Sequence, residues 1–145
     1  MAKKKCFVCE NGMEELALHE AECMVKYGWY AHFVDDDSDF PYHVNCHTHG
    51  LEKKYGHPDF QICFPLPVEI AHSILSNLAN AVKAGDLFLA NDKRYSNILG
   101  NNFDIKLIEA TECGRTVLRV ILPDKFNVLD KDQIDKKYSD QYGGK

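Results

Sequence analysis

The chain has 145 residues, of which 45% are hydrophobic and 27% charged, and 22 acidic residues outnumber 17 lysines and arginines. This composition is typical of one globular domain. The net charge of −5 disfavours a general nucleic-acid binder, because phosphate contacts need clustered cations. No window approaches the roughly 18 uninterrupted apolar residues of a membrane span, and no apolar segment follows the basic start to indicate a signal peptide. We therefore expect a cytoplasmic protein with neither a nucleic-acid nor a membrane partner.

Four potential metal ligands lie near the start of the chain: Cys6, Cys9, His19 and Cys23. Thiolates and imidazoles are the ligands that Zn²⁺ prefers, and a Cys-x₂-Cys turn lets both sulfurs reach one ion. Residues 13–27 are predicted to form a helix, because their apolar side chains recur at a period of 3.6, and His19 and Cys23 then share one face. The spacing predicts a structural zinc site, with Cys46 or a histidine from residues 47–59 as a possible replacement ligand. A redox Cys6–Cys9 pair is the alternative.

A second group of polar residues follows two predicted strands, 29–34 and 42–46, which flank an acidic turn. Residues 47–59 are predicted to form a long polar loop, and a His-x-His on an extended segment places both imidazoles on one side. Such residues can hold an open three-ligand metal site that activates water, or supply a general base without a metal. A solvated loop with no chemistry is the remaining alternative. The candidate catalytic residues are His47, His49, His57, Asp59 and His72.

The rest of the chain predicts a strand over 60–64, a helix that starts at Pro67 and ends before Gly85, and strands over 103–110 and 116–122 joined by a turn at 111–114. The C-terminal end from Tyr138 is expected to fray. These elements predict a single α+β domain with two main helices packed on a largely antiparallel sheet of about five strands, carrying an N-terminal zinc knuckle. The predicted parts are a knuckle over 1–12, a core over 13–124 and a polar tail over 125–145.

Several short motifs occur in the same order as in a known bacterial family. They are Tyr27-Gly28-Trp29, Tyr42-His43-Val44-Asn45-Cys46, Gly56-His57-Pro58-Asp59, the run from Pro65 to His72, and Leu122-Pro123-Asp124. Over roughly residues 13–124 the chain thus resembles the domain-of-unknown-function family four-two-six-two. It departs at Asn45-Cys46, where Gly-Leu is usual, and at Asp59, where Glu is usual. The resemblance implies no activity, but it places His57, Asp59 and His72 on matched motifs.

Three functions remain open at the level of sequence. The first is a zinc-stabilised module that binds a small molecule or a protein, because a four-ligand site has no position left for a reaction. The second is a hydrolase that uses the histidine-rich segment with or without a metal. The third is a redox protein built on Cys6 and Cys9. The sequence specifies neither the ligand nor the oligomeric state.

Overall fold

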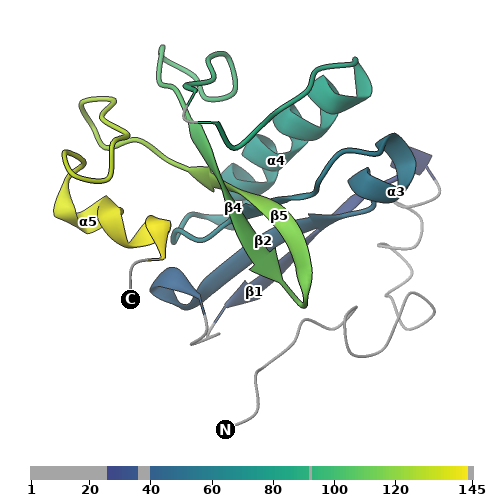
Figure 1. Cartoon of the computed structure of the whole chain (residues 1–145), viewed down its shortest axis with the longest axis horizontal. Coiled ribbons are helices and arrows are strands. Elements are labelled where there is room, and N and C mark those ends of the chain that lie inside the picture. The colour runs from purple at the N-terminus through teal and green to yellow at the C-terminus, as the bar shows by residue number, and fades with distance from the viewer. Residues whose placement is uncertain (1–25, 36–39, 92, 144–145) are drawn as a thin grey trace, which may run out of the picture.

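The computed structural model describes residues 26–35, 40–91 and 93–143, which form a five-stranded sheet with helices (Figure 1). The strands are β1 (Tyr30–Asp35), β2 (Val44–His49), β3 (Phe60–Ile62), β4 (Lys106–Glu112) and β5 (Arg115–Ile121). Their order in the sheet is β1-β2-β3-β5-β4, so β1 and β4 lie at its edges. Every neighbouring pair is antiparallel except β3 and β5. The predicted α+β class and largely antiparallel sheet are confirmed.

The helices differ greatly in length. The long one among the described residues is α4 (Val68–Lys83), as the sequence predicts, while α3 (Leu51–Tyr55) and α5 (Lys136–Ser139) are short. Two 3₁₀ turns, η2 (Pro41–His43) and η3 (Asp140–Tyr142), complete the elements. None of these helices has the length and apolar character needed to cross a membrane. The predicted helix over 13–27, apart from its last two residues, and the predicted zinc ligands lie outside the described residues.

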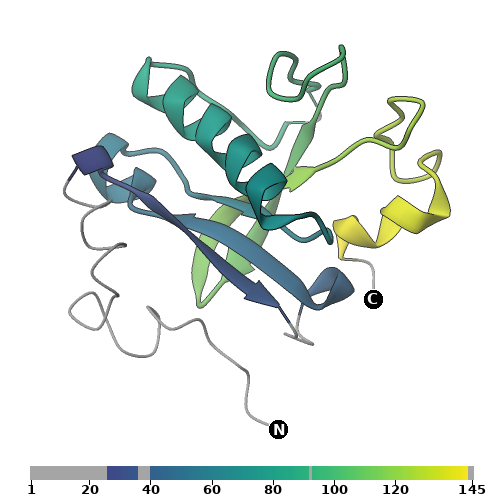
Figure 2. The same ribbon diagram turned by 180° about the vertical axis from the view of Figure 1, so that it is seen from behind.

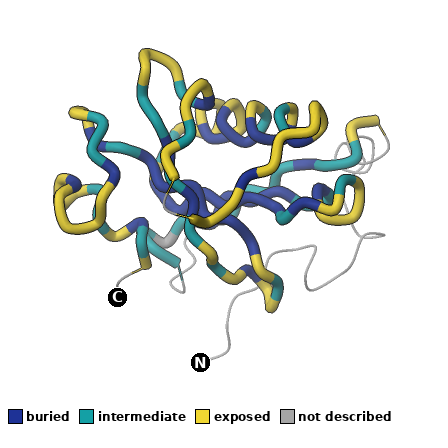
Figure 3. The backbone as a smooth tube through the Cα atoms, turned by 45° about the horizontal axis from the view of Figure 1, so that its top comes forward, coloured by how far each residue is buried: buried dark blue, intermediate teal, exposed yellow. Residues whose placement is uncertain are grey.

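Helix α4 packs against one face of the sheet, as both ribbon views show (Figure 1, Figure 2). Its buried side chains recur every three or four residues, which is the spacing of one helical face; they are Ala71, Ile74, Leu75, Leu78, Ala79 and Val82. The strand residues that meet them alternate along each strand, because successive side chains point to opposite faces. The hydrophobic core lies between these two layers, where the tube of the central strands is largely buried and that of α4 alternates between buried and exposed residues (Figure 3).

The prediction of a long loop over 47–59 is wrong. Strand β2 continues to His49, and α3 then forms between Gly50 and Gly56, which both have positive φ values of 109° and 69°. Glycine adopts this conformation without steric cost, so the chain can leave a strand, make one short helix and turn back within a few residues. The polar character that suggests a loop arises because alternate residues of β2 point away from α4.

The predicted turn over residues 111–114 is too long. Strand β4 extends to Glu112 and β5 begins at Arg115, so Cys113 and Gly114 alone form the turn. Their φ values of 51° and 82° are both positive, as a two-residue type I′ hairpin requires. The longer strands place Glu112 on the sheet rather than in a loop.

The C-terminal segment is also better ordered than the sequence suggests. Leu129, Ile134 and Gln141 are buried, and the amide of Gln141 donates to the carbonyl of Leu122 and accepts from its N–H. The ring of Tyr138 stacks on Phe64 at 5.0 Å. The expected fraying is therefore wrong as far as residue 143, because one buried amide ties the segment to the end of β5. The division into knuckle, core and tail stays a prediction.

Candidate metal site on the polar face of the sheet

The sheet face opposite α4 carries a row of polar side chains. Register pairs His32 with His47 across β1 and β2, His47 with Gln61 across β2 and β3, and Gln61 with Arg119 across β3 and β5. His47 and Gln61 are fully buried and Arg119 is nearly so. Because an unpaired buried polar group costs about 1–3 kcal/mol, such a row persists only if its members bond to one another.

The hydrogen bonds of this row fix the protonation of His47. Arg119 has only donors, so its Nε donates to Oε1 of Gln61 at 2.7 Å. The Nε2 of Gln61 must then donate to Oδ1 of Asn45, which lies 3.0 Å away. The same Asn45 oxygen lies 3.1 Å from Nδ1 of His47, so this ring nitrogen carries a proton and donates. The lone pair of a neutral His47 is therefore on Nε2.

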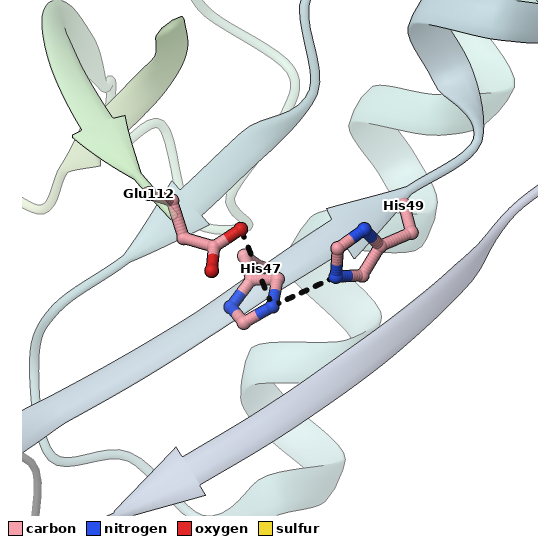
Figure 4. Close-up of side chains that lie close together, drawn as sticks. All are labelled: His47, His49 and Glu112. Carbon is pink, nitrogen blue, oxygen red and sulfur yellow. Dashed lines mark hydrogen bonds and ion pairs between the residues drawn. The ribbon is translucent and has the colours of Figure 1, made fainter. Parts of the chain in front are cut away.

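That Nε2 atom faces two other potential ligands (Figure 4). It lies 3.1 Å from Nε2 of His49 and 3.6 Å from Oε1 of Glu112, and the ligand atoms of the three residues all lie within 4.8 Å of one another. Two nitrogens bound to one ion at about 2.0–2.1 Å stand about 2.8–3.0 Å apart in octahedral geometry and about 3.3–3.4 Å apart in tetrahedral geometry. The three side chains thus already have nearly the spacing of metal ligands.

Electrostatics keep both histidines neutral. Burial lowers the pKa of His47 well below its usual value, and His49, Arg115 and His32 lower it further, although the bond to Asn45 opposes this. Burial, followed by the electrostatic effects of Arg115 and His32, lowers the pKa of His49 to about 3. A neutral imidazole is the form that binds a metal. The site therefore does not have to release protons from these rings at neutral pH in order to bind a cation.

Arg115 holds the carboxylate of this group in place. Its Nε donates to Oε1 of Glu112 at 3.0 Å, its Nη1 to Oδ2 of Asp59 at 2.9 Å, and its Nη2 to the carbonyl of Thr48 at 2.6 Å. Arginine presents its donors in a rigid fork, so these three bonds fix the hairpin tip against the end of β2. Outer contacts of this kind orient the ligands of metal sites.

Asp59 lies in this network, but its contacts stabilise the local fold. Its Oδ1 accepts from the hydroxyl of Thr48 at 2.7 Å and from the N–H of Leu51 at 3.0 Å, and Oδ2 accepts from Arg115. Burial raises the pKa of Asp59, while the Thr48 and Arg115 contacts oppose that rise. Both oxygens are occupied by internal donors, so Asp59 anchors the start of α3 rather than pointing at a ligand.

The other two candidate residues lie away from the group. In buried His57, Nδ1 lies 2.9 Å from the carbonyl of Pro58 and Nε2 accepts from the N–H of Phe88 at 3.0 Å, so both nitrogens are used internally. His72 is exposed on α4, which covers the opposite face, and it stacks on Trp29 at 6.0 Å. Of the five predicted residues, only His47 and His49 belong to the three-residue group.

Sequence reasoning missed Glu112, His32 and Arg115. The strict alternation through β2 was a usable signal, since Asn45, His47 and His49 occupy every second position and place three polar side chains on one face. Glu112 gave no local signal, because it reaches the histidines through the pairing of strands far apart in the sequence.

A separate apolar pocket of about 310 Å³ lies between the start of α4 and the C-terminal segment. Phe64, Ile70, Leu122 and Tyr138 contribute to its walls, with Lys125 among its polar residues. None of the five predicted catalytic residues lines it.

The fold and this site together define an α+β protein with a histidine–carboxylate cluster on the sheet face opposite α4. The family model "Domain of unknown function (DUF4262)" matches residues 24–120. The match covers more than half of the chain, so the protein belongs to this family, as the sequence motifs predict. Neither the curated proteins nor the solved structures contain a match to the chain.

Proposed function

We propose that the protein is a metal-dependent hydrolase whose metal is bound by His47, His49 and Glu112. The observation that carries the proposal is the convergence of two imidazole Nε2 atoms 3.1 Å apart with a carboxylate oxygen 3.6 Å from one of them. Two histidines and one carboxylate are a ligand set of hydrolytic zinc enzymes, and three ligands leave a position for water or substrate. A divalent metal held there supplies a Lewis acid and lowers the pKa of a coordinated water.

The surrounding contacts suit metal binding. The hydrogen bonds from Arg119 through Gln61 and Asn45 put the proton of a neutral His47 on Nδ1, which leaves its lone pair on Nε2. That Nε2 atom lies 3.1 Å from Nε2 of His49 and 3.6 Å from Oε1 of Glu112, so one cation could be bound by all three side chains. Arg115 fixes Glu112 from the other side. In metal sites, hydrogen bonds from surrounding residues commonly orient the ligands in this way.

The same arrangement bears on the other proposed functions. The zinc site at Cys6, Cys9, His19 and Cys23 is a separate proposal, so a test must count two sites. A zinc-stabilised binding module that does no chemistry would need the N-terminal site alone. A hydrolase would need the cluster on the polar face of the sheet. Substitutions in each set therefore distinguish the two functions.

Metal content of the purified full-length protein tests the site. We expect His49→Gln and Glu112→Gln to lower the bound zinc by one equivalent, or the affinity at least about tenfold, since even outer-shell changes cost 10–100-fold. A Cys6→Ser/Cys9→Ser variant, which leaves this cluster intact, should keep that equivalent, and His72→Gln controls for loss of an exposed histidine. Unchanged zinc in both cluster variants, with folding checked by circular dichroism, would overturn the metal site.

Turnover tests the reaction separately. The zinc-loaded protein is expected to hydrolyse p-nitrophenyl acetate or bis(p-nitrophenyl) phosphate faster than the metal-free protein. Glu112→Gln should lose this rate and His72→Gln should retain it. Full zinc binding at the cluster with no turnover above the metal-free protein would refute the hydrolase and leave the metal site standing.

A further inference from the structure

His32 has a nitrogen that the described structure does not use. Its Nδ1 is buried and has no hydrogen-bond partner among the described residues. An unpaired buried nitrogen is costly unless something bonds to it. The residue lies directly opposite His47 in the register of β1 and β2, so the unused atom is beside the proposed metal site.

Ring geometry argues against His32 as a further metal ligand. Its ring stacks on His47 with centroids 5.5 Å apart and planes only 14° apart. The lone pairs of an imidazole lie in the ring plane, so two stacked rings do not direct them at one atom. His32 is also absent from the set of ligand atoms that lie within 4.8 Å of one another. It meets the edge of His49 at 6.4 Å and 84°, and therefore flanks both histidine ligands without joining them.

Burial shows from which side a ligand can reach the metal. His47 and Glu112 are completely or almost completely buried, whereas His32, which lies opposite His47 on β1, is only partly buried. His32 belongs to β1, which is an edge strand of the sheet. Among the described residues, the more exposed side of the proposed metal site is therefore the side on which His32 lies.

Charge identifies the kind of ligand that suits this side. A divalent ion and Arg115 supply three positive charges, whereas the carboxylates of Glu112 and Asp59, which both pair with Arg115, supply two negative ones. The loaded site then has a surplus of one positive charge, which favours an anion. A ring N–H beside the ion adds a hydrogen-bond donor for an oxygen of that anion.

We propose that His32 binds, through Nδ1, an oxyanion that coordinates the open side of the metal, so that the site selects carboxylate- or phosphate-bearing substrates. This inference rests on the proposed metal site and deepens it. It gives His32 the role of a substrate-binding residue and leaves metal binding to His47, His49 and Glu112.

The test uses the full-length protein loaded with Co²⁺, whose visible spectrum reports its ligands. Acetate and inorganic phosphate are titrated separately into the parent, His32→Phe, His32→Asn and the His72→Phe control. The phenyl ring keeps the stacking but has no nitrogen, whereas the amide of asparagine can place a donor near the position of Nδ1. We expect His32→Phe to bind Co²⁺ like the parent but the preferred anion at least about tenfold more weakly, as for one lost bond to a charged group.

The other arms complete the test. His32→Asn should recover part of the anion affinity, and His72→Phe should match the parent. The anion that loses more affinity on His32→Phe identifies the substrate class. Equal anion affinity in the parent and His32→Phe would overturn the proposal, and weaker Co²⁺ binding in His32→Phe would overturn it by making His32 a metal ligand. Failure of the parent to bind Co²⁺ through the cluster would instead refute the metal site and this inference with it.

Discussion

The two faces of the sheet bury different kinds of side chain and are stabilised in different ways. The face under α4 buries apolar residues such as Phe60, Ile62 and Leu118, which gain stability from contact alone. The opposite face buries His47, Gln61 and Glu112, which must be matched donor to acceptor. The difference teaches that burial by itself does not mark a core, because one β-strand can contribute to a core and to a site at alternate residues.

The apolar face should respond most strongly to truncation. Phe60 is fully buried and contacts both His57 and Phe88. We expect Phe60→Ala to lower the free energy of unfolding by about 3–5 kcal/mol, through lost transfer energy and the cavity left behind. Urea denaturation measures it, with half-exposed Val68→Ala as the control, expected to stay within about 0.5 kcal/mol. Equal losses in the two variants would contradict this picture of the core.

The polar face should respond to the loss of one charge. Asp59→Asn removes the negative partner of Arg115 and one acceptor of a network that also holds Thr48 and Leu51. We expect a loss of about 2–3 kcal/mol, because the partner charges stay partly buried without compensation. Asp130→Asn is the matched control, since its ion pair with Lys106 is exposed on the aspartate side and such pairs contribute at most about 1 kcal/mol. A smaller loss at Asp59 than at Asp130 would mean that the network does not hold β2 against the hairpin tip.

The smallest change in the free energy of unfolding is expected from one histidine when the pH changes by one unit. In the folded, metal-free protein the pKa of His49 is about 3 and that of His47 is also lowered, whereas unfolded histidines titrate near about 6.5. Below that pH the unfolded chain binds protons that the folded chain does not. Stability is thus complete above about pH 6.5 and falls by about 1.4 kcal/mol per pH unit for each histidine as the pH drops toward the folded pKa.

Urea denaturation in EDTA between pH 7 and pH 4.5 measures this slope. His49→Gln should reduce the slope of the unfolding free energy against pH by the contribution of about one proton. Val68→Ala, which changes no titratable group, should have the slope of the parent. An unchanged slope in His49→Gln would show that His49 does not resist protonation in the folded state.

The apolar face was the more predictable of the two. The spacing of Ile74, Leu75 and Leu78 predicts α4 and the side that it buries, because a helical face repeats within one turn. Most of the polar face could not be found in this way. His47 and His49 were singled out but assigned to a loop, since polar residues in a strand look like loop residues unless the alternation is followed. Glu112 depends on register between distant strands, which no local pattern encodes.

The parallel pairing of β3 with β5 has a consequence for the order in which the protein assembles. β1–β2 and β4–β5 are antiparallel pairs of strands that follow each other along the chain, whereas Phe60 and Leu118 are brought together across the whole of α4. Contacts between distant residues form late and set the folding rate. His47 and His49 belong to the first pair and Glu112 to the second. The three proposed metal ligands are therefore expected to meet when β3 pairs with β5, so a metal bound by all three would report that pairing.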